Sequence, residues 1–260
     1  RSWIATYLRE SESLHELLGF MEIVMQPLNI LQIDASARPG LSGIDPRGSH
    51  TRRLTRRFIE RWQEARPQDS VAYRDVGQQP PSPVRGDWIA AAFTRPERRD
   101  EAARACLAES DMLVQELLRA DLIVIGAPMY NFGLPAQLKA WLDNVVRVGV
   151  TFGFDRSRQG EPYWPMLPPG KQLVILSSRG DYGYDPGGRL GDINLVERGL
   201  SVPMGYIGLT QTHSIAIEYD EFGDERLRAS ISAAETAVDN LVEELVQNLL
   251  ETADREPALA

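Results

Sequence analysis

The segment "DLIVIGAPMYNFGLPAQLK" (121–139) decides the fold, because an apolar run ends in a short loop bracketed by two prolines. The run has the length and β-branched content of a strand that is buried on both faces. Pro128 lacks an N–H and ends the hydrogen-bond ladder, whereas Pro135 stands at a helix start, where the missing donor costs nothing. The segment therefore predicts a strand, a stiff loop and a helix, the repeating unit of a parallel sheet.

The same alternation extends in both directions along the chain. Further strands are predicted at 28–35, 70–76, 171–178 and 211–219, and helices at 51–65, 96–120, 134–149, 191–202 and 224–251. The Pro-rich segment 77–96 is predicted to be irregular. Five strands that alternate with helices predict an α/β fold: a doubly wound, five-stranded parallel sheet in the flavodoxin-like order 2-1-3-4-5, with helices on both faces.

The first residues differ in character from the rest. Residues 1–24 mix Arg, Glu and His with apolar residues and lack the long apolar core of a signal peptide, and Met25 stands just before the first strand. We therefore expect 1–24 to be an N-terminal extension outside the fold, 25–252 to form a single domain, and 253–260 to be a C-terminal tail.

Composition limits the partners. The 260-residue chain carries a net charge of −9, which argues against nucleic acid or an anionic membrane, since both attract basic surfaces. No stretch approaches the roughly 18–20 apolar residues that span a bilayer. Cys106 is the single cysteine and cannot form an internal disulfide, which favours a reducing, cytoplasmic location. We interpret Cys106 as a buried helix residue rather than a catalytic thiol.

Three loops follow the first, third and fourth strands, at 36–51, 128–134 and 178–188. In the order 2-1-3-4-5 they converge at the carboxyl edge, where strands 1 and 3 diverge and where such sheets bind ligands. The three loops therefore predict one binding site.

The first of these loops suits a phosphate. Ser36 follows the strand, and Ser49 and Thr51 flank the next helix start, where unpaired N–H groups attract anions. Ordinary helix capping explains the same residues. Neither a P-loop nor a G-x-G-x-x-G sequence is present. Four arginines follow on the helix, and a solvated face explains most of them; they are Arg52, Arg53, Arg56 and Arg57.

The second loop suits a flat heterocycle. Met129, Tyr130 and Phe132 offer sulfur and aromatic faces, and the Asn131 amide both donates and accepts hydrogen bonds. Core packing is an alternative for Met129 and Phe132. In the third loop Gly180 allows close backbone approach and Arg179 offers a positive charge to a ligand, but taken alone this loop is better explained as a surface turn.

The segment "APMYNFGLPAQLKAWLDNVVRVGVTF" (127–152), together with "ILSSRGDYG" (175–183) and "GYIGLTQTHSIAIEY" (205–219), resembles the FMN-dependent NADH:quinone oxidoreductases, also called NADH-azoreductases. The resemblance covers about 28–250. It implies that the FMN phosphate is held by Ser36, Ser49, His50 and Thr51. It implies that the isoalloxazine is lined by Met129, Tyr130, Asn131 and Phe132. It implies that the pyrimidine side is contacted by Ser178, Arg179, Gly180 and Asp181.

Two departures from the family pattern stand out. The segment between Ser36 and Ser49 is longer than usual, which affects the phosphate register. Asp181 stands where a second glycine is common, which places a carboxylate near a ring that becomes anionic on reduction.

The resemblance also implies an activity. NADH or NADPH would give hydride to FMN, and quinones, as well as azo compounds, would take it in a ping-pong cycle that needs no catalytic side chain. The absence of a G-x-S-x-G elbow and of a metal-ligand cluster agrees with this. Two alternatives stay open: a flavodoxin-type electron carrier, and a flavin-free interaction module.

Two further expectations concern apolar segments. Aromatic residues in a long insertion would form walls over the flavin and so weigh against a carrier; they are Phe152, Phe154, Tyr163 and Trp164. The resemblance implies a homodimer. Either that interface or core packing explains a row of apolar residues on one helix, namely Trp141, Val145, Val146 and Val148.

Overall fold

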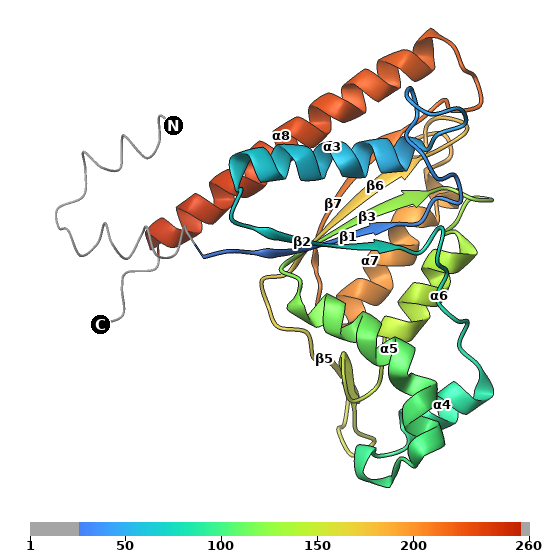
Figure 1. Cartoon of the computed structure of the whole chain (residues 1–260), viewed down its shortest axis with the longest axis vertical. Helices are drawn as coiled ribbons and strands as arrows, with labels where there is room; N and C mark the ends of the chain where they lie inside the picture. Colours follow the sequence, from blue (N-terminus) through green and yellow to red (C-terminus); the bar gives the residue numbers. More distant parts are fainter. Residues whose placement is uncertain (1–25, 256–260) are drawn as a thin grey trace, which may run out of the picture.

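A five-stranded, wholly parallel sheet lies at the centre of the computed structural model, which describes residues 26–255 (Figure 1). Its strands lie in the order β2 (Ser70–Asp75), β1 (Asn29–Asp34), β3 (Leu122–Pro128), β6 (Gln172–Ser178) and β7 (Gln211–Ile217). The predicted flavodoxin-like order 2-1-3-4-5 is therefore confirmed. β3, the strand from which the fold was predicted, is buried along its whole length.

Helices cover both faces of the sheet, as predicted (Figure 1). On one face lie α3 (His50–Ala65) and α8 (Glu225–Arg255); on the other lie α5 (Glu101–Arg119), α6 (Ala136–Val145) and α7 (Val196–Tyr206). Alternate strand residues supply the two apolar layers, so that Ile30 packs toward α3 and α8 while Leu31 packs toward α5 and α6.

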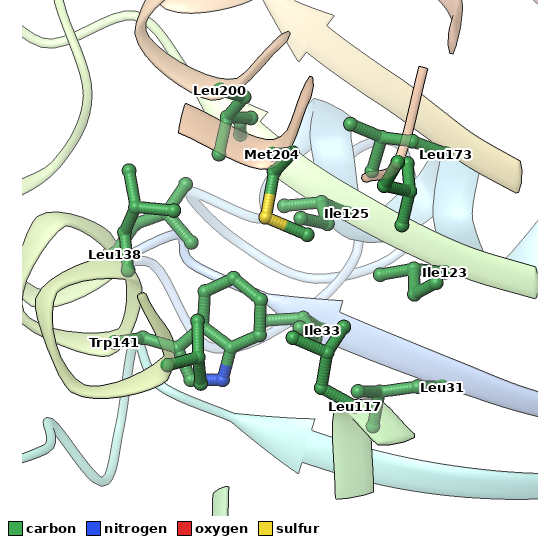
Figure 2. Packing of buried hydrophobic residues seen from close by; sticks show 14 of the residues in the cluster. Leu31, Ile33, Leu117, Ile123, Ile125, Leu138, Trp141, Leu173, Leu200 and Met204 are labelled. Atoms are coloured by element: carbon green, nitrogen blue, oxygen red, sulfur yellow. The ribbon is translucent and has the colours of Figure 1, made fainter. Parts of the chain in front are cut away.

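Trp141 of α6 lies at the centre of the second layer. Figure 2 shows its indole between Leu138 of the same helix and Ile33 of β1, with Leu117 of α5 close by. Trp141 and Val145 are fully buried, so core packing, and not an interface, accounts for these two residues of the predicted apolar row. Val146 and Val148 are half-buried.

The segment 77–96, predicted to be irregular, contains the short helix α4 (Gly86–Phe93). Its sequence "GDWIAAAF" is rich in the best helix former, and the prolines precede the helix instead of interrupting it. Trp88 packs with Ala91, Ala92 and Leu107, which docks α4 on α5. The prediction was wrong here because a helix of two turns leaves little periodicity to detect.

Two predicted helices begin later than expected. In place of one helix over 96–120, a 3₁₀ turn at Pro96–Arg98 precedes α5, and Asp100 caps α5 by accepting a hydrogen bond from the Ala103 N–H at 2.8 Å. Another 3₁₀ turn, at Gly191–Ile193, precedes α7. Cys106 is half-buried on α5.

The aromatic insertion forms a hairpin of β4 (Phe152–Phe154) and β5 (Tyr163–Pro165). Phe154 stacks on Tyr163 at 4.7 Å, and Phe152 lies 5.1 Å from Tyr206 at the C-terminal end of α7. The opposite end of α7 adjoins the loop after β3. Within one chain the predicted aromatic walls therefore stand away from that loop, because the hairpin packs at the far end of α7.

The domain boundaries remain a prediction. α8 ends at Arg255, so the expected boundary at 252 falls within a helix. The expected extension 1–24 and residues 256–260 lie outside the described residues. Between residues 26 and 255, no helix has both the length and the apolar character needed to cross a bilayer.

Replacement of Trp141 tests the packing of the second layer. Its buried indole N–H finds no hydrogen-bond partner among the described residues. Trp141→Ala should lower the free energy of unfolding by about 3–5 kcal/mol through loss of contacts and the resulting cavity. Trp141→Phe should cost less than half as much, because it keeps an aromatic ring and removes an unpaired donor. Urea denaturation measures both; equal costs would contradict this account.

Candidate functional site

Four loops meet at the carboxyl edge of the sheet. The loop after β3 is bonded to the end of β6 by Met129 N–H and the Ser178 carbonyl at 2.9 Å. It is bonded to the loop after β1 by the Tyr130 hydroxyl and the Ala37 N–H at 3.2 Å. The three loops predicted to converge do so, and the loop after β7 joins them, because the Glu221 N–H donates to the Gly180 carbonyl at 3.1 Å.

The loop after β1 brings three buried hydroxyls to the start of α3. Ser49 is the N-cap, since its Oγ accepts from the Arg52 N–H at 3.3 Å, and Thr51 Oγ1 lies 3.0 Å from Ser49 Oγ. Ser36 Oγ accepts from the Arg38 N–H at 3.2 Å. The hydroxyls therefore border the N–H groups at the start of α3, where an anion is stabilised.

The extra length of this loop folds outward. The Ser49 N–H donates to the Gly40 carbonyl at 2.9 Å, which closes residues 40–49 at their base, and Ile44 at the tip is 74% exposed. The insertion therefore leaves the start of α3 next to the end of β1.

The side chain of His50 is committed to protein partners. Its Nδ1 lies 2.8 Å from Ser42 Oγ and its Nε2 lies 3.1 Å from Asp220 Oδ1, and the histidine hydrogen bond lowers the pKa of Asp220. This chain ties the loop after β1 to the loop after β7. Ser42 is itself buried. Only the backbone N–H of His50 faces out of the helix start, so any ligand contact there is through the main chain.

The loop after β3 is a tight two-residue turn. Tyr130 and Gly133 exchange backbone hydrogen bonds of 3.0 and 3.1 Å, and the central residues Asn131 and Phe132 have φ values of 48° and 70°. Positive φ at both central positions defines a type I′ turn, which favours Asn-Gly. Phenylalanine in this conformation is strained, and strain of this kind collects at functional sites. The strain holds the ring of Phe132, which is 48% exposed, toward the site.

Arg179 does not present its charge to a ligand. Its guanidinium is 2% exposed and donates to Glu197 at 2.5 Å, Asp185 at 2.9 Å and Glu218 at 3.0 Å. Three carboxylates therefore already compensate the positive charge that the sequence suggested for a ligand. The Arg179 backbone stays at the edge, where its N–H bonds to the Ile217 carbonyl.

Gly180 and Asp181 follow at the surface of the site. A Cβ on Gly180 would lie 2.6 Å from the Glu221 carboxylate, so the Glu221 side chain packs directly against the Gly180 backbone. Asp181 pairs with Arg189 at 2.5 Å, and this hydrogen bond lowers the pKa of Asp181. A charged carboxylate is thereby fixed beside the crevice.

A crevice of about 430 Å³ opens between the loops after β3, β6 and β7. Five predicted residues line it: Met129, Asn131, Phe132, Gly180 and Asp181. Four lining residues were missed by sequence reasoning: Tyr184, Leu190, Ile193 and Glu221. They carry no motif, although a loop that follows the fifth parallel strand had to end at the same edge. Of the other predicted residues, Ser178 is buried at the end of β6, and Tyr130 reaches the loop after β1.

Comparison with known proteins agrees with this geometry. Residues 29–242 match the protein family Flavodoxin_2, described as "Flavodoxin-like fold". The "FMN-dependent NADH:quinone oxidoreductase 2" of Idiomarina loihiensis is 43% identical over 218 residues, which is 83% of this chain and 90% of that protein. The "FMN-dependent NAD(P)H:quinone oxidoreductase 1" of Pseudomonas aeruginosa is 43% identical over 193 residues, 73% of this chain and 91% of that protein.

A solved azoreductase from Bacillus anthracis superposes with a TM-score of 0.72 at 22% identity, covering 84% of this chain and 99% of that one. Fold and site thus define a protein of the flavodoxin-like class. Within that class the chain belongs to the family of FMN-dependent NADH:quinone oxidoreductases, so the resemblance noted in the sequence is confirmed.

Backbone strain at Phe132 can be measured with two variants that both remove the ring. Phe132→Gly should be more stable than Phe132→Val by about 1–2 kcal/mol, because glycine adopts positive φ freely and a β-branched residue does not. Phe222 is similarly exposed and does not have positive φ, so there the Val variant should be more stable than the Gly variant. Chemical denaturation gives the four values, and an equal or more stable Phe132→Val would contradict the strain.

Proposed function

We propose that this protein passes hydride from NADH or NADPH to quinones through bound FMN. The crevice at the carboxyl edge of the sheet, lined by the loops after β3, β6 and β7, is the observation that carries the proposal. The rigid turn with its exposed phenylalanine borders this crevice, and the helix start with its hydroxyls lies at the same edge of the sheet. The names of the relatives support the same activity.

The residues fit FMN. Main-chain N–H groups at the start of α3 and the hydroxyls of Ser36, Ser49 and Thr51 would hold the phosphate. Gly180 packs against the Glu221 side chain, and both residues line the crevice. The ring would be lined by Met129, Tyr130, Asn131 and Phe132 and flanked by the segment Ser178–Asp181. His50 would contribute through its backbone, because both ring nitrogens are occupied.

FMN supplies a ring nitrogen that accepts a hydride and returns it. The protein places the reactants: Phe132, Leu190 and Ile193 offer apolar surface against which a flat ring would pack. The Asn131 amide can donate to and accept from the edge of a heterocycle. Asp181 and Glu221 put negative charge beside the ring, and Arg189 compensates the first of them. No side chain has to act as a nucleophile.

Azo compounds are proposed as second acceptors, each needing two reduction cycles, and the solved azoreductases of the same fold support this. The flavodoxin-type carrier stays the alternative, because the aromatic hairpin does not cover the crevice within one chain. A reducing, cytoplasmic location belongs to the proposal, supported by the single cysteine.

The activity has a direct test. The purified protein should be yellow with flavin absorption, and NADH should be consumed steadily with a benzoquinone and hardly at all without it. Phe132→Gly should lower kcat/KM about 10-fold or more, because the wall over the ring is lost. A flavin-loaded protein that exchanges electrons only with other proteins would establish the carrier instead, and a colourless protein that takes up no added FMN would overturn both.

A homodimer is part of the proposal. Leu195, Val202 and Tyr206, near the start, middle and end of α7, are 52%, 64% and 41% exposed, and their spacing puts them on one side of the helix. These three residues form an exposed apolar stripe, which extends to the hairpin because the ring centroids of Tyr206 and Tyr163 lie 6.0 Å apart. The stripe adjoins the crevice, since the Leu195 N–H donates to the Phe132 carbonyl at 2.9 Å.

Light scattering after gel filtration tests the dimer. The wild type should have twice the chain mass, and Val202→Asp should shift it toward the monomer by placing a charge in an apolar interface. Gln115→Asp, at an exposed position of α5, should leave the mass unchanged. A wild type that is monomeric at micromolar concentration would show that α7 is not an interface.

A further inference from the structure

We propose that Arg52 is a positioning residue that orients the loop after β1 for the FMN phosphate without touching the phosphate; this inference rests on the proposed function. Arg52 occupies the first turn of α3, among the residues that would surround the anion. From the sequence alone it belongs to a run of arginines explained mostly by a solvated face. The structure separates it from the others.

Arg52 uses all five of its N–H donors on protein partners. Its Nε donates to the Arg38 carbonyl at 2.8 Å, and its Nη2 donates to the Ser36 carbonyl at 2.9 Å. The two terminal nitrogens bind the Asp75 carboxylate in a bidentate pair of 2.7 and 2.8 Å, and Nη1 also donates to Tyr73 at 3.0 Å. The residue is 7% exposed. A guanidinium has no donor beyond these five, so no donor is left for a phosphate.

The two loop carbonyls decide where the loop N–H groups point. In a trans peptide the C=O and N–H bonds point in opposite directions. Because Arg52 holds the Ser36 carbonyl, the N–H of the same peptide, on Ala37, points to the other side. There it donates to the Tyr130 hydroxyl at 3.2 Å, which belongs to the loop that borders the crevice. Arg52 therefore keeps carbonyl oxygens, which would repel an anion, away from the side that an anion approaches.

The anchor of Arg52 is rigid. Asp75 ends β2, next to β1 in the sheet. Gly77 follows, and a Cβ there would lie 2.1 Å from the Ser36 carbonyl oxygen and 3.0 Å from Arg52 Nη2. The buried Asp34 carboxylate lies 3.7 Å from Arg52 on the remaining side and accepts from the Thr55 hydroxyl at 2.8 Å. The loop after β1 is thus packed between the end of β2 and α3, and at Gly77 only glycine fits.

Arg53 also contacts the loop after β1, through the Ser42 carbonyl at 3.4 Å, whereas Arg56 and Arg57 pair elsewhere and provide controls. Arg56 pairs with Glu60 one turn along the same helix, and both side chains are 56% exposed. Arg57 pairs with Asp239 of α8 at 2.7 Å. Neither ion pair involves the loop after β1, so Arg56→Met removes a positive charge from α3 without breaking a hydrogen bond to the loop.

Paired titrations with FMN and riboflavin, followed by flavin fluorescence, test the proposal, because riboflavin lacks the phosphate. Arg52→Met should raise the Kd for FMN at least 10-fold and leave the Kd for riboflavin within about 3-fold of the wild type. Arg52→Lys should behave similarly, since one ammonium cannot make the forked contacts. Arg56→Met should change neither value. Gly77→Ala, which displaces the Ser36 carbonyl from the β2 side, should reproduce the selective loss.

Folded Arg52→Met, verified by circular dichroism, with an unchanged Kd for FMN would overturn the proposal. A parallel loss of both flavins would also overturn it, because that result shows a general structural role. If Arg52→Met does not fold, Gly77→Ala and Asp75→Asn take its place in the test. In each, the Kd for FMN should rise at least 10-fold while the Kd for riboflavin stays within about 3-fold of the wild type. A wild type that binds neither flavin overturns the proposed function itself, whereas flavin binding that is insensitive to these variants overturns only the role of Arg52.

Discussion

The divergence of β1 and β3 is the constraint on which the molecule depends. All five strands run parallel, so their carboxyl ends lie at one edge. From β1 the chain crosses over α3 on one face of the sheet, and from β3 it continues into α6 on the other face (Figure 1). The two loops therefore leave the edge in opposite directions, and the space between them cannot be filled by either helix. In open parallel sheets this is the place where ligands bind.

The walls of this space are held mainly by the main chain and by side chains that never face it. The turn at Asn131–Phe132, the close approach at Gly180 and the gripped carbonyls of the loop after β1 are all backbone features. Arg179 and Arg52 are both buried among carboxylates behind the surface. Buried charge behind the edge thus fixes geometry, while the crevice itself is lined by Asn131, by apolar side chains and by the carboxylates Asp181 and Glu221. Such an arrangement suits a cofactor that brings its own chemistry.

Much of this could be predicted from the sequence, for local reasons. The buried run at 122–128, the two prolines of its loop and the serines before α3 are signals within a few residues, and they gave the order of the sheet and five residues of the crevice. What was missed depends on partners far along the chain. Arg179 meets Glu197 and Glu218, 18 and 39 residues away, and Arg52 meets Asp75, 23 residues away. No pattern of spacing distinguishes these arginines from solvated ones. The hairpin at β4 and β5 has an obvious aromatic composition, but only packing against α7 decides where it stands.

The hydrogen bond between His50 and Asp220 joins residues 170 positions apart, and Glu221 lines the crevice near the end of the last loop. During synthesis on the ribosome, the loop after β1 therefore emerges long before the loop after β7, with which it must pair. His50, at the start of α3, has no Asp220 partner until β7 and the corner that follows it, residues 218–224, have been synthesised. Contacts of such long sequence separation form slowly. Nascent or truncated chains that end before this corner consequently contain the start of α3 but lack Asp220 and Glu221, so the crevice is complete only when most of the chain has been synthesised.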